Sequence, residues 1–122
     1  MDLENAIAAH KTWTIKLRNA ILSNETLDVD VISRDNCCEL GKWLHGEGKD
    51  KHCGLAGFFA CVEKHAAFHI EAGNVANLVN EKRNKEAEDQ LDYASSAFGQ
   101  ASNSVILALT RLKQEVAINC TQ

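Results

Sequence analysis

Proline is absent from this 122-residue chain, and glycine occurs only seven times. Because proline is the strongest helix breaker, its absence suits long helices, and the shortage of both residues disfavours a turn-rich β architecture. The hydrophobic fraction of 45% and the charged fraction of 25% are ordinary for a soluble globular protein. A chain of this length can bury roughly two-thirds of its unfolded surface, so we expect one self-sufficient domain.

Other absences exclude whole classes of function. The net charge is −4 and no basic block stands out, which argues against a nucleic-acid partner. No apolar run reaches the roughly 18 residues that a membrane span needs, so we expect no membrane contact by this segment. The first eleven residues carry acidic side chains and no apolar core, unlike a secretory signal. These features predict a soluble, cytoplasmic protein.

The five cysteines are an odd number and lack the regular spacing of a secreted, disulfide-bonded scaffold. In a reducing compartment, thiols close to histidines indicate metal binding or redox chemistry. Any one free cysteine taken alone is more often a small buried hydrophobic residue.

Apolar residues recur at helical spacing in three segments, residues 2–23, 55–80 and 86–118. Capping residues at 33–36 and Gly46 predict a further short helix over residues 37–45. We interpret residues 24–36 as an extended connector and residues 46–51 as a polar loop. The last helix has a nearly heptad-spaced apolar stripe, which is typical of packing in an antiparallel bundle.

Histidines interrupt two of these apolar stripes. His65 and His69 are four residues apart, so their Cβ atoms should lie about 5–6 Å apart on one helix face. Both imidazoles could then bind a single ion, although two hydrogen-bonded core histidines would give the same pattern. His10 lies on the apolar face of the first helix between Ile7 and Leu17. Three inward histidines on two helices favour a metal site in the bundle interior.

Cys38 is the expected fourth ligand. It opens the segment Cys-Glu-Leu-Gly-Lys-Trp at 38–43, and a thiolate is a strong zinc ligand. A position near a helix start is expected to lower the pKa of its thiol. The neighbouring Cys37 could replace it as ligand or serve as an oxidation partner. Cys61 precedes His65 by one helical turn and could compete for the metal, but we favour a buried thiol.

The chain resembles the chemoreceptor zinc-binding domain family of bacterial chemotaxis receptors and some diguanylate cyclases. The resemblance rests on a first-helix histidine (His-Lys-Thr-Trp, 10–13), on the segment at 38–43, and on His-Ala-Ala-Phe-His at 65–69. It implies zinc ligation by His10, Cys38, His65 and His69 in a helical bundle that forms a homodimer. Gly41 and Trp43 match structural positions of the family.

Together, these features predict an all-α fold, an antiparallel four-helix bundle with an additional short helix carrying the cysteine ligand, as a single domain over residues 1–122. Four protein ligands close the coordination sphere of zinc, which marks a regulatory rather than a catalytic site. The resemblance implies that zinc occupancy or cysteine oxidation is coupled to chemotaxis or cyclic-di-GMP output, through a fused or separate output domain.

Two alternatives remain at this stage. A metal-free helical dimerisation or interaction module is the simpler one. A hydrolytic zinc enzyme is the other, but it needs Cys38 off the metal and a general base that no motif supplies. An iron-carboxylate site would need inward acidic residues, and the apolar stripes contain none.

Overall fold

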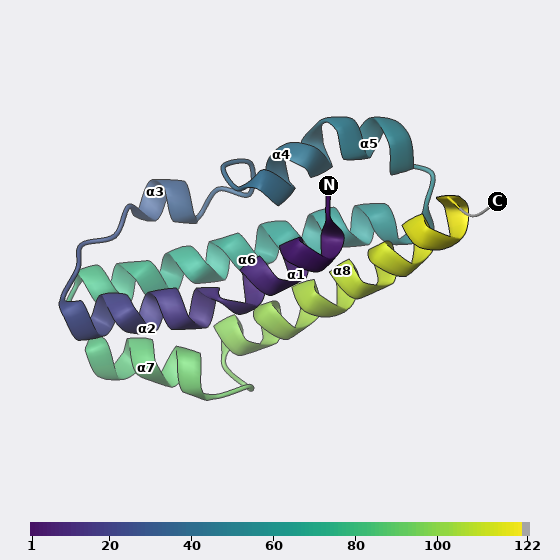
Figure 1. Ribbon diagram of the computed structural model, residues 1–122. Helices are drawn as coiled ribbons and strands as arrows, with labels where there is room; N and C mark the ends of the chain where they lie inside the picture. Colours follow the sequence, from purple (N-terminus) through teal and green to yellow (C-terminus); the bar gives the residue numbers. More distant parts are fainter. Residues whose placement is uncertain (121–122) are drawn as a thin grey trace.

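The computed structural model describes residues 1–120 and shows an all-helical bundle, as the sequence predicts. Three arms form its body: α1 (Leu3–Lys11) followed by α2 (Trp13–Ser23), the long α6 (Ala56–Asn80), and α7 (Asn84–Asp92) followed by α8 (Ala97–Cys120). A fourth arm of short helices runs along α6, as Figure 1 shows; it comprises α3 (Val29–Ile32), α4 (Glu39–His45) and α5 (Glu47–His52). Successive arms run in opposite directions (Figure 1).

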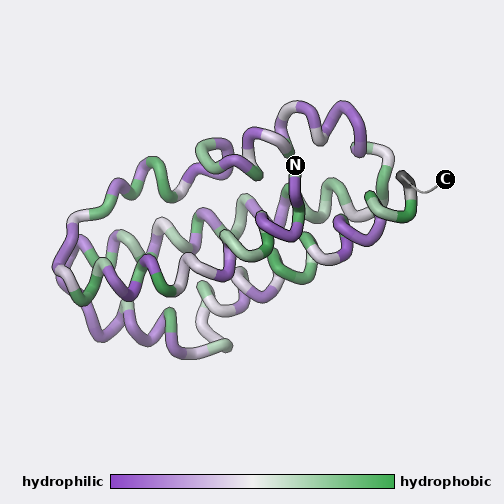
Figure 2. Tube along the Cα trace, viewed as in Figure 1, coloured by the Kyte–Doolittle hydropathy of each residue, from purple (hydrophilic) through white to green (hydrophobic). Residues whose placement is uncertain are grey.

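The core lies between α1–α2, α6 and α8. Three phenylalanines fill it, Phe58 and Phe68 from α6 and Phe98 from α8, and the rings of the last two lie 5.6 Å apart. Each phenylalanine is at most 2% exposed. By contrast, α5 and α7 are mostly hydrophilic (Figure 2), because each covers the bundle with one face only. Within residues 1–120, no helix has both the length and the apolar character needed to cross a membrane.

The first and last predicted helices are each broken once. The helix predicted over 2–23 is interrupted at Thr12, whose hydroxyl donates to the carbonyl of Ala9 (2.7 Å). The helix predicted over 86–118 is interrupted between Asp92 and Ala97. There the Ser96 hydroxyl donates to the carbonyl of Gln90 (2.6 Å) and accepts from the N–H of Gly99 (2.9 Å). Side-chain hydrogen bonds thus replace helical ones at both breaks.

The two predicted connectors are also partly helical. Residues 24–36 contain α3, because the carboxylate of Asp28 accepts from the N–H of Val31 (3.2 Å) and caps the helix. Residues 46–51 were expected to form a loop but lie in and next to α5. Gly48 allows this, since a Cβ there would lie 2.7 Å from the indole of Trp43, against which it packs. The expected loop is therefore wrong, whereas the helix predicted over 55–80 agrees with α6 within one residue.

Candidate metal centre

Four side chains from three helical arms meet inside the bundle. His10 comes from the last turn of α1, Cys38 from the residue before α4, and His65 and His69 from successive turns of α6. One ligand atom from each lies within 4.8 Å of all the others. The three histidines are 3% exposed or less, and Cys38 is partly buried.

The spacing of three of the donor atoms, those of Cys38, His65 and His69, fits a metal ion. The Cys38 Sγ lies 3.2 Å from His65 Nε2 and 3.6 Å from His69 Nε2, and the two Nε2 atoms are 3.0 Å apart. Ligands at about 2.0–2.3 Å from a tetrahedral zinc are themselves about 3.3–3.6 Å apart. The set of three imidazole nitrogens and one sulfur also matches the ligand chemistry that zinc prefers.

Backbone carbonyls orient two of the histidines. His10 Nδ1 lies 2.8 Å from the carbonyl oxygen of Ala6, and His69 Nδ1 lies 2.9 Å from that of Ile32. An Nδ1–H that donates to a carbonyl leaves Nε2 with its lone pair free for a metal. The Nε2 of His10 is buried and has no hydrogen-bond partner among the described residues. A metal ion would satisfy this otherwise costly buried nitrogen.

His65 differs from the other two histidines, because its buried Nδ1 has no hydrogen-bond partner among the side chains and backbone that the structure describes. It is fully buried, and burial, aided by the nearby His69 and His10, lowers its pKa to about 3. Burial also lowers the pKa of His10 and His69, although their carbonyl partners oppose the shift. All three imidazoles are therefore neutral at pH 7, the form in which they bind metals.

Cys38 sits at the N-cap of α4 and uses its sulfur as the capping atom. The N–H of Gly41 donates to Sγ (3.3 Å). The expected lowering of the thiol pKa is wrong for the metal-free chain, because burial raises the pKa more than the backbone N–H groups lower it. A metal ion would have to displace the thiol proton, so binding at this sulfur is coupled to proton release.

Gly41 lets the chain close over Cys38. A Cβ at this position would lie 1.6 Å from the carbonyl oxygen of Asp35, so only glycine fits against that backbone. Trp43 packs partly buried at the core edge, and its ring lies 5.7 Å from that of His52. Both residues thus have the structural placement that the resemblance implies.

The other thiols and histidines whose side chains the structure describes lie outside the cluster. Cys37 is exposed, next to the side chain of Asn36, and Cys61 is fully buried, which raises its pKa to about 12. His45 is exposed as expected, and its Nε2 lies 2.8 Å from a carboxylate oxygen of Asp35. His52 was expected to be solvated, but it is half-buried and its Nδ1 has no partner among the described residues.

The sequence analysis missed the two backbone carbonyls that orient His10 and His69. The carbonyls of Ala6 and Ile32 belong to the backbone, so no residue type identifies them. The first could have been inferred, because a histidine four residues after a helical carbonyl can reach it. The second depends on α3 packing against α6, which joins residues 37 positions apart.

Comparison with known proteins agrees with this geometry. Residues 10–76 match the family model described as the chemoreceptor zinc-binding domain. The matched stretch starts at His10 and includes Cys38, His65 and His69. No curated protein and no solved structure gives a significant match. Because the family model covers more than half of the chain, the protein belongs to the chemoreceptor zinc-binding domain family.

Proposed function

We propose that the chain is a regulatory domain that binds one zinc ion through His10, Cys38, His65 and His69. The observation that carries the proposal is the convergence of four donor atoms, all within 4.8 Å of one another, from three arms of the bundle. His10 and His69 would present Nε2 because carbonyls hold their Nδ1 atoms, and His65 would present the Nε2 nearest Cys38. Cys38 would supply the thiolate.

The zinc would act structurally rather than catalytically. With all four positions taken by protein, no site remains for an activated water, so we propose that the domain is not an enzyme. Three neutral imidazoles and one thiolate leave a complex of charge about +1 by addition. The ion would join α1, α4 and α6, and its binding free energy would stabilise their arrangement.

We propose that this stabilisation is the signal. Loss of zinc, or oxidation of the Cys38 sulfur, would release α4 from α6, and an output domain or a partner would sense the change. The family's description supports a role in chemoreception. Bacterial chemotaxis and cyclic-di-GMP synthesis are the two outputs that the resemblance implies. The homodimer, the single domain over 1–122 and the cytoplasmic location remain predictions. The packing of α8 against α6 and α1 supports the prediction of a single domain.

Metal analysis of the purified protein tests the zinc site. We expect about one zinc per chain and, by X-ray absorption, one Zn–S bond of about 2.3 Å. Cys38→Ser should lose the Zn–S bond, whereas Cys61→Ser should keep it, because Cys61 is buried away from the cluster. Less than about a tenth of an equivalent after reconstitution would favour the metal-free module. Zinc without a Zn–S bond would favour an open, hydrolytic site.

Oligomer mass tests the dimer and its link to zinc. Sedimentation of the zinc-loaded protein should show a dimer. The same measurement on the chelator-treated protein shows whether the dimer depends on zinc. A monomer under both conditions would contradict the homodimer without affecting the metal site.

A further inference from the structure

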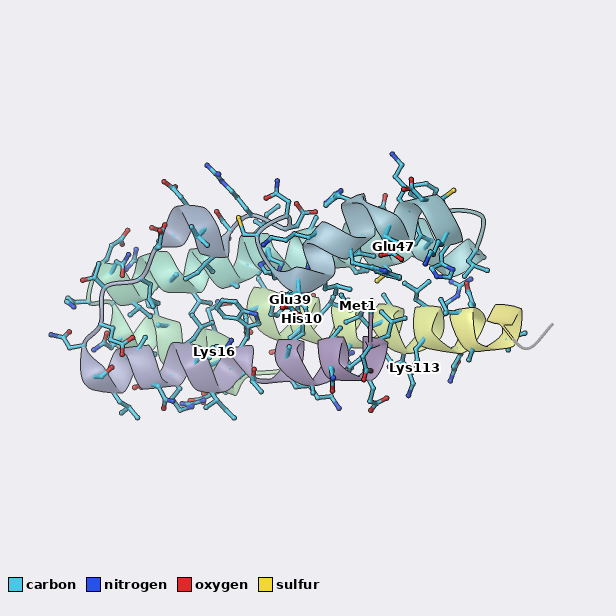
Figure 3. All side chains as sticks on the ribbon, turned by 45° about the horizontal axis from the view of Figure 1, so that its top comes forward. Met1, His10, Lys16, Glu39, Glu47 and Lys113 are labelled. Atoms are coloured by element: carbon cyan, nitrogen blue, oxygen red, sulfur yellow. The ribbon has the colours of Figure 1, made fainter. Side chains whose placement is uncertain are left out.

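A cavity opens beside the cluster, between the start of α1–α2 and the start of α4. Its volume is about 400 Å³, and its lining includes both His10 and Cys38. Met1, Ala9 and Trp13 line it from the N-terminal arm, and Glu39 lines it from α4. Figure 3 labels Met1, His10, Lys16 and Glu39, which lie along the border between these two arms. We refer to it as the α1–α4 cavity.

This cavity reaches the cluster from the side where the cluster is least enclosed. His65 and His69 are at most 2% exposed, and neither lines the cavity. Cys38 is only partly buried, and it lines the cavity together with His10. Four other cavities of the described surface are lined by none of these four residues.

The size of the α1–α4 cavity suits a hydrated cation, and the carboxylate-bearing Glu39 lies on its α4 side. At about 30 Å³ per water molecule, its volume exceeds that of a divalent ion with its first shell of water. The carboxylate of Glu39 is exposed and makes no ion pair with any residue in the described part of the chain. The one lysine of the lining, Lys16, holds its ammonium 5.0 Å over the ring of Trp13.

We propose that the α1–α4 cavity is the route by which zinc enters and leaves the cluster, with Glu39 attracting the cation toward Cys38. The inference rests on the proposed zinc site, but it concerns the rates of exchange rather than the affinity. A substitution that narrows the route without touching the ligands slows the entry and the exit of zinc by the same factor. The ratio of the two rates, which is the dissociation constant, then stays unchanged.

Two neighbouring alanines provide a matched pair of variants. Ala8 and Ala9 are both exposed on α1, but only Ala9 lines the cavity. Ala9→Phe fills part of the route, whereas Ala8→Phe adds the same ring to the same helix outside it. Zinc stoichiometry and affinity of the wild-type protein are measured first. Stopped-flow mixing with a zinc indicator then gives the capture rate, and transfer to a strong chelator gives the release rate.

We expect Ala9→Phe to slow both rates by about tenfold with the dissociation constant within about twofold, and Ala8→Phe to leave both unchanged. Glu39→Gln should slow capture at low salt and lose this effect at high salt, because the attraction is screened. Equal rates for Ala9→Phe and wild type would overturn the route. A change confined to release would also overturn it, because it would indicate damage to the site. A wild-type protein that takes up no zinc would instead refute the proposed function itself.

Discussion

Gly73 holds α3 and α6 together next to the cluster, and its replacement by alanine gives the most informative single test. Gly73 lies one turn after His69 on α6 and is buried against Ser33, which ends α3. A Cβ on Gly73 would lie 2.6 Å from the Cβ of Ser33, whereas ordinary contacts begin at 3.4 Å. The end of α3 must therefore move away from α6 by about the 0.8 Å difference.

This displacement would act on His69 through its backbone partner. The carbonyl of Ile32, which immediately precedes Ser33, lies 2.9 Å from His69 Nδ1, and a shift of that size would take the hydrogen bond beyond its usual range. Loss of the hydrogen-bond partner of a metal-binding histidine typically lowers metal affinity 10–100-fold. We therefore expect Gly73→Ala to weaken zinc binding at least about tenfold. The corresponding free energy is about 1.4 kcal/mol.

The stability of the zinc-free protein should change much less. Alanine favours a helix over glycine by about 1 kcal/mol, which opposes the cost of displacing α3. Zinc affinity is measured by competition with a chelator, and stability by denaturation of the zinc-free protein. Ser33→Gly added to Gly73→Ala removes the contacting Cβ and should restore most of the affinity. Gly54→Ala is the control, because no atom lies within 4 Å of its added Cβ.

A Gly73→Ala protein that binds zinc as tightly as the wild type would refute this reasoning. Failure of Ser33→Gly to restore binding would do so as well, because the effect could then not arise from the α3–α6 contact.

Three further predictions concern the ligands and their support. Chelator competition should show that Cys38→Ala loses at least about 100-fold in zinc affinity, whereas Cys61→Ala stays within about twofold; the reverse result would make Cys61 the ligand. Gly41→Ala should unfold the start of α4, since its Cβ would lie 1.6 Å from a carbonyl oxygen, and the loss should appear as weaker zinc binding and lower helicity. The zinc-free protein should lose stability as pH falls. Burial lowers the pKa of His65 to about 3 in the folded protein, whereas a histidine in the unfolded chain has a pKa of about 6.5. Between these two values only the unfolded chain binds the proton, which favours unfolding. This residue alone should lower the free energy of unfolding by about 2 kcal/mol at pH 5, as measured by denaturant titration. A free energy of unfolding that is the same at pH 7 and pH 5 would contradict the burial of His65 as a neutral group.

Local sequence patterns were enough for the helical class and for the long α6. Its apolar residues repeat every three or four positions over 25 residues, and His65 and His69 are placed on one face by the helix geometry itself. The breaks in the first and last helices escaped prediction because the apolar stripe continues across them. The Ser96 hydrogen bonds that stabilise the second break carry no periodic signal.

The family assignment also followed from the sequence and is confirmed by the match over residues 10–76. The roles of His10, Cys38, His65 and His69 as ligands remain a prediction, which is supported by four donor atoms within 4.8 Å of one another. The direction of the Cys38 pKa was wrong because the sequence shows a helix start but not how deeply the sulfur is buried. Burial depends on which arms cover the residue.

The sequence by itself determined what depends on neighbours within a few residues: helix formation, the shared face of two histidines, and the pattern that identifies the family. Only the tertiary structure decided what joins distant parts of the chain. It set Cys38 3.2 Å from His65, brought the carbonyl of Ile32 to His69, and opened a cavity beside His10. These contacts join residues that are tens of positions apart and depend on how whole arms pack. The spacing of residues along the sequence therefore does not predict them.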